Sequence, residues 1–365
     1  MHVLPSALPP PLSELLEFGT RSSIGHSPTA DLTVDCSLGS DEADGSYQRP
    51  LRSIAAAIRR AHTVGREVAN PTVIDIAEGT CHLEEPLKLG GREAAPIHLR
   101  GRGVSSVLSG GKPIDGWAST PWDNAPPGAV YVAEVRDWPV EIKSLRAGSH
   151  AIPRSRWPRR VAEGLRSTNW MFAMNWSAHP SSAAISSGGR HLHHLGLNAS
   201  ELPANASLAE LVGAYANVLG CVESDVNSQL TKVLAVNSTN ASRPTVAMLF
   251  RNSFNVGQRF YLENVRWALA PGEFYHDARA GKLFYWPANG TLPAAGSVVA
   301  PVLDTLIALD HAHGHVVSHL TLTDTTYYAD GYWDGPAKQP SDAAIRINYC
   351  TGVRVTACNF LGSRV

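Results

Sequence analysis

The chain has 365 residues, of which 44% are hydrophobic and 17% charged, a balance that allows a large core and excludes a disordered protein. Its 31 basic and 32 acidic residues leave a formal net charge of −1, which argues against a nucleic-acid partner, because nucleic-acid binders usually carry a basic excess. No run of 18 apolar residues occurs, so no membrane span is expected. The 31 glycines and 25 prolines predict many turns and few long helices.

Residues 1–30 are rich in proline and serine and predict a disordered leader. They lack the basic segment and apolar run of a signal peptide, so none is visible in this chain. A short strand and an acidic, turn-rich loop are expected next. Leu51, Ile54 and Ile58 then recur at helical spacing, which predicts an amphipathic helix over 51–62.

Short segments near both ends of the chain alternate apolar and polar residues, as half-buried β-strands do. These segments are residues 72–83, 96–103, 105–111, 315–324, 343–350 and 353–360. No helix-length pattern separates them, so βαβ units are not expected, and either a β-sandwich or a β-solenoid fits. Gly79 and Gly110 suit tight corners, and the apolar stripe of the 51–62 helix suits an open end; both features favour the solenoid.

The middle of the chain differs, because residues 117–300 hold eight of the nine tryptophans and low-complexity stretches of Ala, Ser and Asn. Residues 273–287 predict a β-hairpin with aromatic-rich arms that turns at 278–281. We therefore expect a β-rich inserted domain. The predicted domains are a leader at 1–30, a cap and first coils at 31–116, the insertion at 117–300, and further, incomplete coils at 301–365.

Several segments, taken in their order, resemble the pectin-lyase-like right-handed parallel β-helix proteins. More narrowly, they resemble the glycoside-hydrolase-like branch of right-handed parallel β-helix repeat proteins. The matching segments are residues 39–61, 73–90, 107–117, 262–290, 303–324 and 344–363. The resemblance implies an all-β fold, a right-handed parallel β-helix with an N-terminal capping helix and an inserted β-rich domain. It also implies a carbohydrate-related role, in which the retaining enzymes of such families use paired carboxylates.

The chain departs from this pattern at its C-terminal end. In the resembling proteins, further coils normally follow the position of residues 358–363 and tend to carry the catalytic acids. Here the sequence stops at Val365. We therefore expect a fragment or a degenerate relative, with catalytic acids beyond Val365.

The segment that follows the 315–324 strand is the richest in chemistry. Sugar rings stack on aromatic side chains, and sugar hydroxyls donate to carboxylates. Glycoside cleavage needs two carboxyl groups, about 5–5.5 Å apart in retaining enzymes. The candidate catalytic acids are Asp324, Asp330 and Asp334, and the candidate substrate-binding residues are Tyr327, Tyr328, Tyr332 and Trp333. The competing interpretation is a solvated loop in which Asp and Gly only form turns.

Three other groups have competing interpretations. His311, His313 and His315 could ligate zinc on one strand face, but Gly314 interrupts the run and favours a turn, so no metal site is expected. Glu273 follows a Pro-Gly pair typical of a type II turn and is expected to hold the hairpin. The basic run of Arg154, Arg156, Arg159 and Arg160 could grip an acidic sugar, although a solvated or salt-bridged surface is favoured.

The five cysteines are too few and too scattered for a disulfide framework, which favours free thiols with one bridge at most. Six glycosylation sequons favour an extracellular or secretory location; they begin at Asn175, Asn198, Asn205, Asn237, Asn240 and Asn289. No nucleotide-binding or GxSxG motif is present, and no cofactor is expected.

The leading hypothesis is a carbohydrate-active protein of glycoside-hydrolase type whose partner is a poly- or oligosaccharide. The alternatives are a non-catalytic glycan-binding or cell-surface module and, less favoured, a polysaccharide lyase. The sequence leaves the oligomeric state open.

Overall fold

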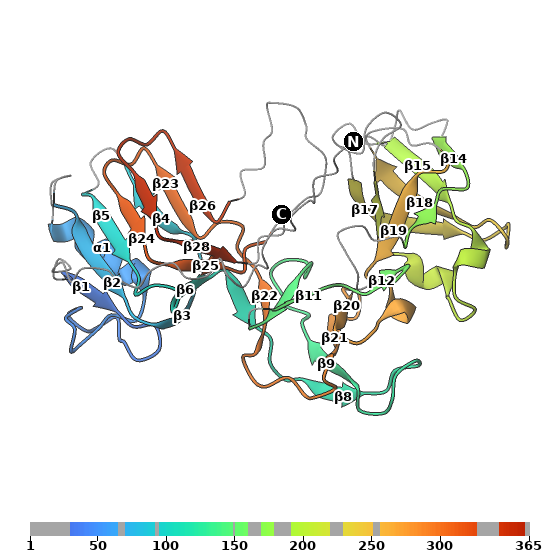
Figure 1. Cartoon of the computed structure of the whole chain (residues 1–365), viewed down its shortest axis with the longest axis horizontal. Coiled ribbons are helices and arrows are strands. Elements are labelled where there is room, and N and C mark those ends of the chain that lie inside the picture. Colours follow the sequence, from blue (N-terminus) through green and yellow to red (C-terminus); the bar gives the residue numbers. More distant parts are fainter. Residues whose placement is uncertain are drawn as a thin grey trace, which may run out of the picture.

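The computed structural model describes residues 30–64, 70–91, 95–148, 150–159, 169–178, 191–219, 229–250, 256–326 and 343–361. Within these ranges the protein is nearly all β, with α1 (Ile54–Val64) as the one α-helix. Figure 1 shows two bodies: a stack of strands from both ends of the sequence, and a second body from its middle. The all-β fold class is confirmed. The predicted leader lies almost wholly outside the described residues.

In the first body, which we call the coil, every strand pairs in parallel within one of three sheets of the described chain. The first sheet contains β1 (Leu32–Val34), β2 (Thr72–Ile76), β5 (Ile97–Arg100), β24 (Val316–Ser318) and β27 (Arg354–Thr356). The second contains β3 (Gly79–His82), β6 (Ser106–Ser109), β25 (Thr321–Thr323) and β28 (Asn359–Leu361). The third contains β4 (Leu87–Gly90), β23 (Ile307–Asp310) and β26 (Ile345–Asn348). The chain visits the three sheets in this order again and again, which separates the coil from a sandwich of antiparallel strands.

The interior of the coil is filled by apolar side chains that lie in register from one strand to the next. In the first sheet, Leu99 lies between Ile74 and Val317, and all three are fully buried. Burial stabilises each such side chain by about 1.5–3 kcal/mol relative to exposure. The helix α1 packs Ile54 and Ile58 against the same core, so it covers the open end as the apolar stripe predicts.

The start of the helix differs from the prediction, because α1 begins at Ile54 and not at 51. Leu51 instead forms a parallel bridge with Val34 of β1. Ser53 precedes the helix, and its hydroxyl accepts a hydrogen bond from the backbone N–H of Ala56 at 3.1 Å. A Ser in this position satisfies one of the free donors of the first turn, which is why the helix starts here.

The corners of the coil are not made by glycine alone. His319 and Ala357 adopt φ values of +55° and +52° where the chain passes from the first sheet to the second. Residues 315–324 therefore form two strands, β24 and β25, with the corner between them, where the alternation predicts one. The earlier equivalent, Gly101, has no room for a side chain, since a Cβ atom there would lie 2.0 Å from the carbonyl oxygen of His319.

The second body, which we call the insertion, leaves the coil after β6 and returns before β23 (Figure 1). Its described strands pair in antiparallel fashion in three sheets. A small sheet joins it to the coil and contains β7 (Gly111–Pro113), β22 (Val298–Pro301), β10 (Leu145–Ala147) and β11 (His150–Ile152). The next, which we call the hairpin sheet, contains β8 (Ala118–Thr120), β9 (Val130–Glu134), β21 (Lys282–Trp286) and β20 (Glu273–Asp277). The pairing of β20 with β21 confirms the predicted hairpin.

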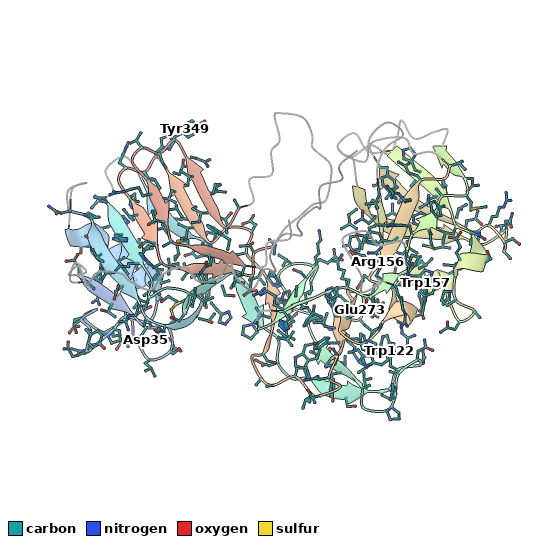
Figure 2. All side chains as sticks on the ribbon, viewed as in Figure 1. Asp35, Trp122, Arg156, Trp157, Glu273 and Tyr349 are labelled. Carbon is teal, nitrogen blue, oxygen red and sulfur yellow. A yellow bond between two sulfur atoms is a disulfide. The ribbon has the colours of Figure 1, made fainter. Side chains whose placement is uncertain are left out.

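The largest sheet of the insertion has eight strands. They are β12 (Arg156–Trp157), β13 (Met171–Phe172), β14 (Trp176–Ala178), β15 (His191–Gly196), β16 (Tyr215–Val218), β17 (Gln229–Asn237), β18 (Thr245–Phe250) and β19 (Arg259–Glu263). Short 3₁₀ turns lie at η3 (Ala199–Glu201), η4 (Leu208–Leu211) and η5 (Arg266–Ala268). Figure 2 places Asp35 and Tyr349 on the coil and Trp122, Arg156, Trp157 and Glu273 on the insertion.

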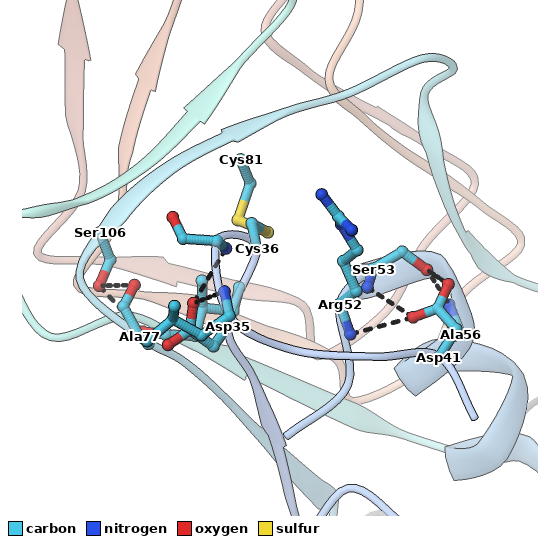
Figure 3. Close-up of a disulfide and its surroundings, with 12 residues drawn as sticks. Asp35, Cys36, Asp41, Arg52, Ser53, Ala56, Ala77, Cys81 and Ser106 are labelled. Carbon is cyan, nitrogen blue, oxygen red and sulfur yellow. Dashed lines mark hydrogen bonds between the residues drawn. A yellow bond between two sulfur atoms is a disulfide. The ribbon is translucent and has the colours of Figure 1, made fainter. Parts of the chain in front are cut away.

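A disulfide between Cys36 and Cys81 ties the segment after β1 to β3, with 5.3 Å between the Cα atoms (Figure 3). Beside it, Asp41 accepts hydrogen bonds from the backbone N–H groups of Arg52 and Ser53 and from the Ser53 hydroxyl. Burial disfavours the Asp41 carboxylate, but these hydrogen bonds outweigh that cost and hold the pKa of Asp41 below its usual value. Both features fix the acidic loop against the coil.

Two other cysteines, Cys350 and Cys358, are half-buried free thiols, and Cys221 lies outside the described residues. No helix in the described ranges is long and apolar enough to cross a membrane.

Candidate functional site

Asp324 lies where the coil meets the insertion, directly after β25. One carboxylate oxygen is 2.8 Å from Nε of Arg146 on β10, and the other accepts a hydrogen bond from the hydroxyl of Ser109 on β6 at 2.7 Å. The Asp324 backbone has a φ of +57°, and its side chain is buried. Both oxygens are therefore held, one by each body, so Asp324 joins the insertion to the coil.

The remaining candidates of that segment lie outside the described residues. These are Tyr327, Tyr328, Asp330, Tyr332, Trp333 and Asp334. Their catalytic and substrate-binding roles stay predictions, and so does the catalytic role of Asp324. Sequence reasoning missed Arg146, since a lone arginine in a short strand carries no signal of the carboxylate it will meet.

A group of buried charges lies inside the insertion, where the hairpin sheet meets the largest sheet. Arg154 is 4% exposed and Glu263 2% exposed, with 4.0 Å between Nη1 and Oε2. The Arg154 guanidinium also lies 4.5 Å from the ring centre of Tyr215 and donates to the carbonyl oxygen of Ile142 at 3.4 Å. The expectation of a surface position for Arg154 is therefore wrong, because its side chain is enclosed by Tyr215, Glu263 and the carbonyl of Ile142.

Glu141, Lys232 and His276 continue this group. Lys232 Nζ lies 3.2 Å from the Glu141 carboxylate, and Tyr215 donates to the same carboxylate. Burial works against the charge on Glu141, but Tyr215 and Lys232 outweigh it and lower its pKa. The pKa of His276 is also lowered, by burial first and then by the positive charge of Arg154. At neutral pH the group therefore holds a charged carboxylate next to an uncharged imidazole.

Arg156 is also buried, contrary to the expected surface position, and lies against aromatic rings. Its guanidinium carbon is 3.7 Å from the ring centre of Tyr261 and 4.9 Å from that of Trp170. The next residue, Trp157, packs edge-on against Trp267 with 5.5 Å between the ring centres. The planar guanidinium stacks well on aromatic faces, so this part of the basic run holds the sheet together. Arg159 is exposed, and Arg160 lies outside the described residues.

Glu273 occupies the turn position expected for it. Its backbone N–H donates to the carbonyl of Ala270 at 3.0 Å, and Gly272 before it has a φ of +82°. This geometry is that of a type II turn, in which the third residue needs a positive φ. The Glu273 side chain is buried at the start of β20.

The three histidines of residues 311–315 lie in the connection between β23 and β24. His311 stacks on Tyr349, with 5.1 Å between the ring centres. His315 is fully buried, and its Nδ1 accepts a hydrogen bond from the backbone N–H of Ile97 at 3.1 Å. Burial lowers the pKa of His315 to about 4, which keeps it neutral. Across the described ranges no group of His, Cys, Asp and Glu side chains could hold a metal ion.

The six sequon asparagines all belong to the insertion. Five are exposed, whereas Asn198 is half-buried. In four of them the side-chain oxygen accepts from the backbone N–H two residues on, at Asn198, Asn237, Asn240 and Asn289. Asn198 differs again, because its amide nitrogen also donates to Glu201 at 3.3 Å.

Comparison with known proteins found no matching family model and no matching curated protein. A solved structure named "Glycoside hydrolase" is similar over 92% of this chain, with a TM-score of 0.64 and 20% sequence identity. A second, "The complex structure of XylC with xylose", covers 80% of this chain and 40% of its own at a TM-score of 0.23 and 9% identity, too low to support an argument. The chain spans 62% of the first structure's length. At this identity, the likeness shows a shared fold.

Proposed function

We propose that the chain is part of a carbohydrate-active protein of glycoside-hydrolase type that acts on a poly- or oligosaccharide. The observation that carries this proposal is the shared fold, coil and insertion together, with a structure named as a glycoside hydrolase. The segments that resemble pectin-lyase-like β-helix proteins support it independently, since they lie in both bodies.

Within this proposal Asp330 and Asp334 are better candidates for catalysis than Asp324. A carboxyl group that acts as acid, base or nucleophile needs an oxygen available to the substrate. Both oxygens of Asp324 are engaged by Arg146 and Ser109. Asp324 is therefore proposed as a positioning residue at the base of the segment that carries the other two.

The test measures release of reducing sugar from a panel of plant and algal polysaccharides. Asp330→Asn and Asp334→Asn should each lower the rate at least about a hundredfold if they supply proton transfer. The control is Asp304→Asn, at an exposed aspartate of the coil, which should leave the rate unchanged. Absence of release from every polysaccharide contradicts an active hydrolase, and unsaturated products would instead indicate a lyase.

We also infer passage through the secretory pathway, supported by the Cys36–Cys81 disulfide and the six sequons. Secretion from a eukaryotic host followed by enzymatic removal of N-glycans should lower the mass of the protein. Peptide mapping should find Asn289 modified and Asn198 unmodified, because the Asn198 amide nitrogen already donates to Glu201. A secreted protein that carries no N-glycan contradicts this inference.

A further inference from the structure

Four of the six sequon asparagines gather at one end of the largest sheet. The strands β14, β15, β18 and β17 lie side by side in this order (Figure 1). At that end Asn237 of β17 pairs with Thr245 of β18, and Thr245 pairs with Gly196 of β15. The backbone carbonyl of Asn175, which precedes β14, accepts a hydrogen bond from the Gly196 N–H at 2.9 Å. Asn175 and Asn237 therefore lie in one row across four neighbouring strands.

The other two asparagines lie just beyond the strand ends. Asn240 belongs to the turn that joins β17 to β18, and Asn198 follows β15. The turn lies next to Asn198, because the Ala199 N–H donates to the carbonyl oxygen of Ser242 at 3.2 Å. Neighbouring strands are about 4.8 Å apart, so the four strands span about 15 Å. We call this surface the sequon end; it consists of residues 174–175, 196–199 and 237–245.

At Asn237 and Asn240 the side-chain amide is fixed with its oxygen turned toward the backbone. Oδ1 of Asn237 accepts hydrogen bonds from the N–H and the hydroxyl of Thr239, at 2.9 and 2.7 Å. Oδ1 of Asn240 accepts from the N–H groups of Ser242 and Arg243, at 3.1 and 3.2 Å. Because the amide group is planar, Nδ2 then points away from these backbone donors. Nδ2 is the atom that carries an N-glycan, and both asparagines are exposed.

Asn175 is held differently, against a glycine. A Cβ atom at Gly196 would lie 1.6 Å from Oδ1 of Asn175 and 2.7 Å from its Cγ. The amide oxygen of Asn175 therefore occupies space that any other residue at position 196 would fill. Asn175 remains exposed, so its amide nitrogen is also on the solvent side.

Asn198 is the exception at the sequon end. It is half-buried, and its Nδ2 donates to Glu201 at 3.3 Å. Outside the sequon end, Asn289 is exposed in the connection between β21 and β22 and has the same turn geometry as Asn237, with Oδ1 bound to the Thr291 N–H at 3.1 Å. Asn289 therefore serves as an internal reference for glycosylation away from the largest sheet.

The opposite end of the largest sheet differs in composition. Phe172 pairs with Arg259 there, and Val256 lies just before β19; Phe172 is 47% and Val256 67% exposed. The turn over 237–244 contains only Asn, Ser, Thr, Ala, Arg and Pro. Protein interfaces are enriched in aromatic side chains, and sugar rings stack on them. The sequon end is therefore poorly suited to bind a protein or a sugar ring.

We propose that N-glycans on Asn175, Asn237 and Asn240 together cover the sequon end, so that substrate and partners approach the protein elsewhere. This inference rests on the proposed passage through the secretory pathway and specifies which surface is modified. The donor is an oligosaccharide joined to a lipid diphosphate. A bond forms between Nδ2 and the anomeric carbon, the bond from that carbon to the diphosphate breaks, and Nδ2 loses one proton.

The first measurement identifies the occupied sites. The full chain is secreted from a eukaryotic host, and an amidase releases its N-glycans in water enriched in a heavy oxygen isotope. Release converts each glycosylated Asn to an Asp with one heavy oxygen, which peptide mapping detects. We expect the label at Asn175 and Asn289 but not at Asn198. Asn237 and Asn240 share one turn, so at least one of the two should carry the label.

The second measurement tests whether the glycans cover the surface. The secreted protein is oxidised by hydroxyl radicals before and after glycan removal. Leu234 precedes Asn237 on β17, whereas Phe172 lies at the other end of the sheet, and each is 47% exposed. Leu234 should be oxidised less before glycan removal than after it. Phe172, the matched control, should be oxidised equally in both states.

Two variants separate the sequon end from Asn289. Combined Asn175→Gln, Asn237→Gln and Asn240→Gln should abolish the difference at Leu234, and Asn289→Gln should preserve it. If the triple variant is not secreted, the wild-type comparison decides alone. Label at Asn289 alone, or equal oxidation of Leu234 in both states, overturns this inference and leaves passage through the secretory pathway standing. Absence of N-glycans from every site removes both.

Discussion

The coil and the insertion are both built from short β-strands, yet they bury different chemistry. The interior of the coil consists of apolar layers such as Ile74, Leu99 and Val317. The insertion also buries arginine and glutamate side chains, among them Arg154 and Glu263. The polar side chains that the coil buries, such as Ser106 and His315, form hydrogen bonds with its own backbone, whereas the charged groups buried in the insertion must be paired.

Removal of a buried charge in the insertion should cause the largest decrease in the free energy of unfolding. Glu263→Gln leaves the buried Arg154 guanidinium without this carboxylate, and breaking such a pair costs about 3–5 kcal/mol. Chemical denaturation measures the change. Glu134→Gln, in the half-exposed pair with Lys282, should change the free energy of unfolding by less than about 1 kcal/mol. Equal effects of the two substitutions would contradict the idea that burial makes the Arg154–Glu263 pair more important than an exposed one.

Truncation in the coil tests its apolar layers. Leu99→Ala removes a fully buried side chain between two others and should lower the free energy of unfolding by about 2–5 kcal/mol. Leu292→Ala, at a 55% exposed position, should change it by no more than about 0.5 kcal/mol. A small effect at Leu99 would mean that the layers can collapse around the cavity.

A substitution at the junction between the coil and the insertion should have an intermediate effect on the free energy of unfolding. In Asp324→Asn the amide oxygen can still accept from Ser109, but the charge opposite Arg146 is lost, so we expect a loss of about 1–3 kcal/mol. Relative to wild type, amide hydrogen exchange in Asp324→Asn should become faster in β10 and β25. It should stay unchanged in β17, which lies far from the junction in the largest sheet. Unchanged exchange in β10 would argue against a joining role for Asp324.

The smallest expected change in the free energy of unfolding is the one that a lower pH causes in the coil. The pKa of His315 is lowered from its ordinary value of 6.5 to about 4, by burial and by the neighbouring His62 and His313. Between these values the unfolded state binds the extra proton, so stability falls as the pH falls. From pH 6.5 to 5.5 the free energy of unfolding should drop by about 1 kcal/mol for this group.

Denaturation at the two pH values measures this drop, and His315→Gln should reduce it. The lowered pKa values of His98 in the coil and His276 in the insertion act in the same direction, so an unchanged drop in His315→Gln would assign the effect to those two histidines.

Comparison of the predicted strands with the observed ones shows where a local sequence pattern is sufficient to predict the structure. The hairpin of β20 and β21 is visible in the sequence, because its turn residues and alternating arms lie next to each other. The corner at His319 is not visible, since histidine seldom adopts a positive φ, and only the parallel neighbours on each side hold it there. For the same reason Val316 is expected to share a face with Leu320 and Leu322, whereas Val317 is the residue in register with the core of the first sheet.

For the site residues, too, the local sequence indicates the chemistry, whereas the fold sets the surroundings. Sequence chemistry singles out Glu273 and the basic run, but burial decides what they do, and it places Arg154 and Arg156 inside the insertion. The partners of these side chains, such as Glu263 and Tyr261, lie about a hundred residues farther along the chain. No local pattern records a contact over that separation.

The sequence by itself determined the all-β class, the helix that covers the coil, the aromatic hairpin and the presence of a β-rich middle, because each of these depends on neighbouring residues and on the local spacing of apolar side chains. Tertiary structure alone decided where the coil turns, which arginines are buried, and which aromatic rings pack side by side. Those outcomes depend on contacts between strands distant in sequence, and the free energy of such contacts is defined only once the sheets have formed.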